Sequence, residues 1–128
     1  MSHPKIAPAE WTVMEVLWKE ATLSAAEVIE VLERESDWRP KTIRTLLDRL
    51  VRKGVVSREK RAGCYRYSPK VGRAECIRKE RQSFLGRFFG GDLAPMVANF
   101  LDDRETTPED IERLRRLLDE RARKGDSQ

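Results

Sequence analysis

The stretch between Trp38 and Gly54 constrains the fold most strongly, because it encodes one sharply two-sided helix. Pro40 suits the first helical position, and Gly54 suits the position just past the helix end. Four apolar residues share one helical face, at the spacing i, i+3, i+4 and i+7: Ile43, Leu46, Leu47 and Leu50. The rest of the circumference is polar and rich in cations and hydroxyls: Lys41, Thr42, Arg44, Thr45, Asp48, Arg49 and Arg52. We therefore expect a helix that packs one face on a core and leaves the other open.

The positive charge of the chain is concentrated around this helix. Residues 39–73 hold twelve Lys or Arg residues against two acids, a net charge of +10. Residues 1–38 have a net charge of −5, and residues 74–128 a net charge of −1. Such a block favours a polyanionic partner. Arg and Lys bind phosphates and guanine edges, so the helix is a candidate for insertion into a DNA major groove, with a merely solvated face as the alternative.

Two helical patterns precede the basic helix. The first begins at Pro8, and its apolar stripe is formed by Trp11, Met14, Leu17, Trp18 and Ala21, with Val13 at the edge. Because the tryptophans stand at helical spacing beside Met14 and Leu17, we expect them to pack in a core rather than stack on bases.

The second helical pattern begins with a capping box, Ser24-Ala25-Ala26-Glu27. Its outer side carries Glu27, Glu30, Glu33 and Glu35, which phosphates would repel, so we interpret it as a supporting helix. The short connector Ser36–Arg39 then leads into the basic helix, which predicts a helix-turn-helix.

A change of period after Gly54 predicts a β-hairpin. The runs Val55–Lys60 and Tyr65–Pro69 carry β-branched and aromatic residues, and Arg61–Cys64 between them holds the glycine expected of a hairpin loop. A two-stranded hairpin directly after a helix-turn-helix is a wing. Its cations would lie along a phosphate backbone, although a solvated, charge-decorated edge is the alternative: Arg58, Lys60, Arg61 and Arg66.

The remainder of the chain predicts three amphipathic helices, over Gly72–Phe89, after Asp92, and after Thr107-Pro108. Helices this short bury too little surface to be stable alone. We therefore expect a winged-helix domain over residues 1–71 and a helical dimerisation domain over 72–128. A C2 dimer would place two basic helices on a palindromic DNA site. The expected interface residues are Phe88, Leu93, Met96, Val97, Phe100, Leu101, Ile111, Leu114, Leu117 and Leu118.

Signals for catalysis, metal binding or membrane insertion are missing from the sequence. The one histidine is His3, and Cys64 and Cys76 have neither Cys-x-x-Cys spacing nor a nearby histidine, so we expect no enzyme activity, metal or cofactor. No apolar run reaches the roughly 20 residues of a membrane span, and no signal-peptide core is present. The expected location is the cytoplasm, with reduced thiols.

Four segments resemble the penicillinase-repressor family of bacterial winged-helix regulators (BlaI/MecI/CopY): Pro8–Met14, Asp37–Leu46, Arg49–Gly54 and Val97–Phe100. The resemblance implies a homodimeric repressor with an N-terminal winged helix. In the β-lactam-responsive branch it further implies release by cleavage at Asn-Phe, Asn99-Phe100 here, in a pathway with a membrane sensor-transducer protease. The copper-responsive branch has a C-terminal cysteine cluster, which Arg121–Gln128 lacks.

Together these patterns predict a mainly α fold with a small β-hairpin wing: a winged helix-turn-helix followed by a three-helix dimerisation region. The predicted function is repression of an operon of the β-lactamase or antibiotic-resistance type through operator DNA. Two alternatives stay open. One is a winged-helix repressor of another regulon, released by a ligand or by a thiol switch at Cys64. The other is a basic adaptor that docks an acidic protein.

Overall fold

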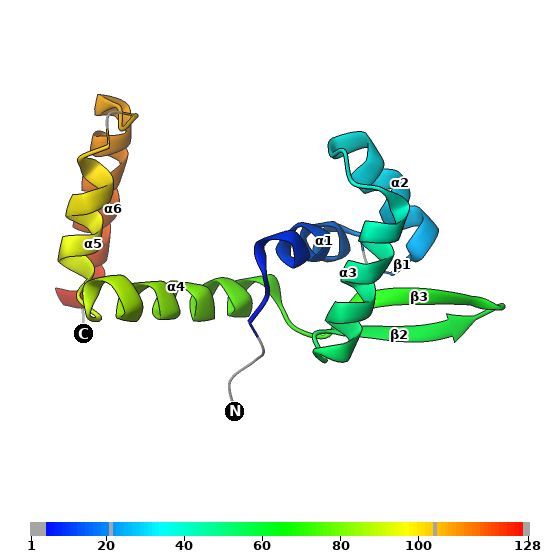
Figure 1. Cartoon of the computed structure of the whole chain (residues 1–128). Coiled ribbons are helices and arrows are strands. Elements are labelled where there is room, and N and C mark those ends of the chain that lie inside the picture. Colours follow the sequence, from blue (N-terminus) through cyan, green and yellow to red (C-terminus); the bar gives the residue numbers. More distant parts are fainter. Residues whose placement is uncertain (1–4, 21, 104, 127–128) are drawn as a thin grey trace. The chain divides into compact units, whose positions relative to one another are not determined.

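A computed structural model describes residues 5–20, 22–103 and 105–126 (Figure 1). The described elements follow in the order α1 (Pro8–Lys19), β1 (Leu23–Ser24), α2 (Ala25–Glu35), α3 (Pro40–Arg52), β2 (Val56–Arg61), β3 (Cys64–Pro69), α4 (Arg73–Phe89), α5 (Leu93–Leu101) and α6 (Pro108–Asp126). The chain divides into two compact units, Met1–Ile77 and Arg78–Gln128. None of the described helices is both long enough and apolar enough to cross a membrane.

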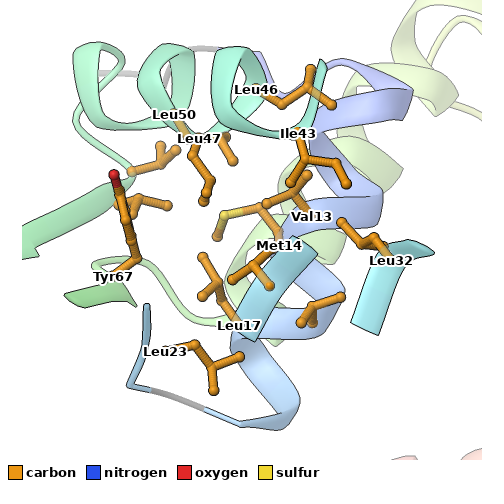
Figure 2. Packing of buried hydrophobic residues seen from close by; sticks show 14 of the residues in the cluster. Val13, Met14, Leu17, Leu23, Leu32, Ile43, Leu46, Leu47, Leu50 and Tyr67 are labelled. Carbon is orange, nitrogen blue, oxygen red and sulfur yellow. The ribbon is translucent and has the colours of Figure 1, made fainter. Parts of the chain in front are cut away.

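The first unit is built on a core shared by α1, α2, α3 and the sheet (Figure 2). Met14 of α1 points toward the apolar face of α3, Leu17 lies closer to Leu23, and Leu32 of α2 belongs to the same cluster. Trp11 and Trp18 are partly buried against this core with their rings 5.3 Å apart, edge to face, as their helical spacing predicted. The α2–α3 pair confirms the helix-turn-helix, and Ser24 and Glu27 make the reciprocal hydrogen bonds of the capping box.

The sheet has three strands in the order β1-β3-β2, so the prediction of a two-stranded hairpin was incomplete. Leu23 pairs with Tyr67, and Ser24 pairs with Arg66, in an antiparallel register. A strand of two residues shows no alternation, and its second residue is also the N-cap of α2, so the sequence showed only the cap. The short strand ties the start of α2 to the wing.

The tip of the hairpin is tighter than predicted. Arg61 pairs with Cys64, so both are strand residues and only Ala62 and Gly63 form the turn. Both turn residues have positive φ, 52° and 78°. This is the condition for a two-residue turn whose twist matches that of the strands. The sequence interpretation overlooked it because Ala is an unusual residue in the left-handed region.

The second unit contains most of α4 together with α5 and α6. Phe84 of α4 stacks on Phe100 of α5, with ring centroids 6.1 Å apart and planes inclined by 17°. Asp92 caps α5, and Thr107 accepts a hydrogen bond from the backbone N–H of Asp110 at the start of α6. No residue of α5 is buried, so this unit has little core of its own.

Candidate nucleic-acid interface

Helix α3 presents a polar surface directly opposite its buried face. Ile43, Leu47 and Leu50 are completely buried. The residues of α3 that were predicted to contact DNA are all exposed: Lys41, Thr42, Arg44, Thr45 and Arg49. The Thr45 hydroxyl donates a hydrogen bond to the carbonyl of Lys41, 3.0 Å away. One helix therefore packs an apolar face on the core and exposes a set of cations and hydroxyls to solvent.

The C-terminal end of α3 is held by an ion pair that the sequence interpretation did not find. Lys53 donates to the carboxylate of Glu10, which is only 1% exposed, and to the carbonyl of Lys5 at 2.8 Å. Burial raises the pKa of Glu10, but hydrogen bonds from Lys53 and from the Ala7 backbone outweigh it, and the net pKa is lowered. Ala7 has no side-chain oxygen, so the cap of α1 carried no recognisable Ser-x-x-Glu signature.

The predicted wing cations lie on two opposite faces of the hairpin, because successive strand residues point to opposite sides. The inner face is defined by its two core residues, Val56 and Tyr67, which are 1% and 6% exposed. Four further residues share the inner face: Arg58, Lys60, Tyr65 and Pro69. The outer face carries Ser57, Glu59, Arg61, Cys64, Arg66 and Ser68. The four wing cations expected from the sequence are thus divided into two pairs, one on each face of the hairpin.

On the inner face, a contact joins the wing to α3. Arg58 forms an ion pair with Asp48 of α3, with Nη1 and Oδ1 3.6 Å apart. The Arg58 guanidinium also lies over the Tyr65 ring, 4.5 Å from its centroid, and the Lys60 ammonium lies 5.7 Å from the same centroid. Tyr65 was not predicted as a site residue. Its position two residues before the core residue Tyr67 is the signal that could have placed it on the inner face.

On the outer face, the cations are engaged with neighbouring groups of the protein. Arg66 donates to the carbonyl of Thr22 at 2.8 Å and forms an ion pair with Glu27 at 3.3 Å. The Ser24 hydrogen bonds and Arg66 together lower the pKa of Glu27, so this carboxylate stays charged. Arg61 pairs with Glu59 at 3.3 Å. Arg66 of β3 thereby connects the hairpin to the residue before β1 and to the first turn of α2.

Large apolar side chains remain exposed in the second unit. Phe88 is 61% exposed and Leu118 is 58% exposed, the highest values among the described large apolar residues. Four other predicted interface residues are exposed as well: Leu93, Phe100, Leu101 and Leu117. Four are half-buried: Met96, Val97, Ile111 and Leu114. The sequence-predicted interface is therefore still open within the single chain.

The bond between Asn99 and Phe100 lies in the last turn of α5. The carbonyl of Asn99 accepts from the backbone N–H of Asp102 at 3.3 Å, and that of Phe100 accepts from Asp103 at 3.3 Å. The Thr106 hydroxyl adds a 3.2 Å hydrogen bond to the Phe100 carbonyl. Both residues are exposed at the end of a short helix.

No cluster of three or more metal-ligating side chains occurs within the ranges that the structure describes. Cys64 is exposed near the hairpin tip, and Cys76 is buried in the first turn of α4. His3 lies outside the described residues.

Comparison with known proteins agrees with this arrangement. The sequence model of the family described as penicillinase repressor matches residues 6–120. The penicillinase repressor of Bacillus licheniformis is 39% identical over 117 residues, 91% of this chain and 91% of that protein. The methicillin resistance regulatory protein MecI of Staphylococcus aureus (strain N315) is 33% identical over 117 residues, 91% of this chain and 95% of that protein.

A solved structure supports the fold of the first unit. It is the solution structure of monomeric Bacillus licheniformis BlaI in complex with the blaP half-operator. It matches with a TM-score of 0.52 and 38% identity, covering 58% of this chain and 90% of that one. The relatives named here are repressors and regulators, not enzymes. Because the family model and these relatives cover most of its length, this chain belongs to the penicillinase repressor family.

Proposed function

We propose that the protein is a homodimeric, sequence-specific DNA-binding repressor of an antibiotic-resistance operon of the β-lactamase type. The observation that carries this proposal is the exposed face of α3, where Lys41, Thr42, Arg44, Thr45 and Arg49 stand opposite a fully anchored apolar face. In a helix-turn-helix the first turns of the second helix contact base edges in the major groove. Relatives named as repressors, one of them solved on a half-operator, support the same role.

DNA selection from a random duplex pool tests this assignment. We expect recovery of a palindromic sequence, because a C2 dimer presents two copies of α3. Arg44→Ala should cost about 1–3 kcal/mol and relax the preference at one base pair of each half-site. Arg34→Ala, on α2, is the control and should retain the preference. Recovery of no consensus from the pool would contradict the proposal and favour the adaptor hypothesis.

The dimer is proposed to form through the second unit, within residues 72–128. Its exposed aromatic and aliphatic side chains include Phe88, Leu93 and Leu117, and α5 buries none of its residues within the single chain. Covering such a surface with a second copy removes apolar area from water. One dimer would then bind both half-sites, and binding of its first DNA-binding domain would raise the effective concentration of the other DNA-binding domain at the second half-site.

Release from the operator is proposed to proceed by cleavage between Asn99 and Phe100, in a pathway with a membrane sensor-transducer protease. A helical bond must open before a protease can bind it, and helix ends open more readily than centres. The last turn of α5 is such an end. Cleavage would separate α6 from most of α5, so the dimer surface would be divided while α3 stayed intact.

Mass spectrometry of the repressor from induced cells tests the release mechanism. We expect fragments that end at Asn99 and begin at Phe100. An Asn99→Ala, Phe100→Ala variant should stay whole and bound, provided that sedimentation shows it still dimerises. An intact wild-type chain in fully induced cells would contradict cleavage and favour release by a ligand or a thiol.

A further inference from the structure

The two faces of the wing differ in charge balance. On the outer face Glu59 and Glu27 pair with Arg61 and Arg66, so the two cations are matched by two acids. On the inner face, Asp48 is the one acidic partner of Arg58 and Lys60 among the described residues, which leaves an excess of one positive charge. A polyanion is therefore attracted more strongly to the inner face.

The inner face also continues the surface that α3 exposes. Val56 anchors β2 in the core, and Arg58 and Lys60 follow on the same side at alternate positions toward the tip. The Asp48–Arg58 ion pair shows that Arg58 reaches the exposed side of α3. A duplex whose major groove holds α3 would present a bordering phosphate strand to these two cations.

Arg58 is restrained before DNA arrives. Asp48 holds one end of its guanidinium, and the Tyr65 ring, 44% exposed, lies beneath it at 4.5 Å. An arginine side chain loses considerable rotamer freedom when it is immobilised, so restraint in the free protein reduces the entropy lost on binding. Within the part of the chain that the structure describes, Arg61 pairs only with its exposed neighbour Glu59 and has no aromatic ring beneath its guanidinium.

We propose that the inner face of the wing, formed by Arg58, Lys60 and Tyr65, is the phosphate clamp of this protein, and that Asp48 is its positioning residue. The outer-face cations Arg61 and Arg66 instead maintain the wing and the start of α2. This inference rests on the proposed DNA-binding function and narrows the set of four wing cations that the sequence suggested.

The salt dependence of binding separates the two faces. Each phosphate contact contributes about 0.9 to the slope of log K against log salt concentration. With the full-length protein and a duplex selected from the random pool, Arg58→Gln and Lys60→Gln should each lower that slope by about 0.9. Arg61→Gln is the matched control, on the same strand and the opposite face, and should lower the slope by much less.

Three outcomes can be distinguished. An equal loss of slope in Arg61→Gln and Arg58→Gln would overturn the inference while leaving DNA binding intact. Absence of salt-dependent binding by the wild type would instead overturn the proposed function. For Arg66, the melting temperature should fall in Arg66→Gln with little change in slope, because its partners are Thr22 and Glu27; a lowered slope at unchanged stability would place Arg66 on the DNA.

A double-mutant cycle tests the positioning role of Asp48. If Asp48 positions Arg58 for binding, the change in binding free energy caused by Asp48→Asn should be less favourable in the protein that retains Arg58 than in the Arg58→Gln protein. An equal effect in both backgrounds would mean that Asp48 acts only by its charge on DNA. A more favourable effect in the Arg58 background would mean that Asp48 competes with phosphate for Arg58. Either result would overturn the positioning role.

Discussion

Lys53, the C-cap residue of α3, donates a hydrogen bond from Nζ to the carboxylate of Glu10 in the first turn of α1. The two residues are 43 positions apart in the sequence, and Glu10 is 1% exposed. The same ammonium binds the carbonyl of Lys5 at 2.8 Å. One side chain therefore joins the end of the candidate recognition helix to the start of the first helix and to the segment before it.

The first prediction concerns the pH dependence of stability. Burial raises the pKa of Glu10, but the hydrogen bonds from Lys53 and Ala7 lower it more, so the folded pKa lies below the ordinary 4.5. The ion pair therefore contributes stability above about pH 4.5 and loses it as the pH falls through the folded pKa. Urea unfolding at a series of pH values should show this loss in the wild type and a smaller one in Glu10→Gln. Parallel curves for the two proteins would contradict the assignment.

The second prediction concerns the asymmetry of the same pair. Lys53→Met leaves the buried Glu10 carboxylate without its charged partner, although the Ala7 N–H still donates to it, so we expect a loss of about 1–3 kcal/mol. Glu10→Gln should cost less, because the Lys53 side chain is 31% exposed and its ammonium can turn to water. Unfolding free energies at neutral pH measure both. An equal or larger loss in Glu10→Gln would show that the buried carboxylate is not the sensitive partner.

The periodic parts of the fold could be predicted from the sequence, and the parts without a period could not. Pro40, Gly54 and the Ser24–Glu27 capping box marked helix ends that the structure confirms. The strand β1 was missed because two residues show no alternation of polar and apolar side chains. The hairpin loop was predicted to be longer than the turn that Ala62 and Gly63 form.

The candidate site shows the same limit. The residues on α3 were predicted because one helix supplies them all, and their spacing shows which face they share. The two faces of the wing were not separated, since their assignment depends on the register between β2 and β3. The Glu10–Lys53 pair was missed because its residues are far apart in sequence and each looks like an ordinary surface charge.

The third prediction concerns the second unit. Leu118→Lys places a charge in the proposed dimer surface, and burying an unpaired charge is strongly unfavourable. We expect this variant to sediment as a monomer at concentrations where the wild type is a dimer, with its helical circular dichroism retained. Glu120→Gln changes the net charge by the same amount two residues along α6, on another side of the helix, and should stay dimeric. A dimeric Leu118→Lys protein would place the interface elsewhere.

The last prediction concerns what Thr45 contributes to base recognition. Its hydroxyl proton is already engaged by the Lys41 carbonyl at 3.0 Å, so its methyl group is the part available for a base without breaking that bond. Threonine methyls pack on the 5-methyl group of thymine in the major groove. Thr45→Val keeps the methyl and should keep the base preference, whereas Thr45→Ser keeps the hydroxyl and should lose about 1 kcal/mol, the scale of one buried methyl or methylene group.

Replacing thymine by deoxyuridine at each position of the selected half-site supplies the matched change on the DNA. At one position the substitution should weaken the wild type and Thr45→Val by a similar factor. It should have little effect on Thr45→Ser, because the contact is already absent there. If Thr45→Ser binds like the wild type and Thr45→Val does not, the hydroxyl is the recognising group, and it must leave Lys41 or accept a hydrogen bond from the base.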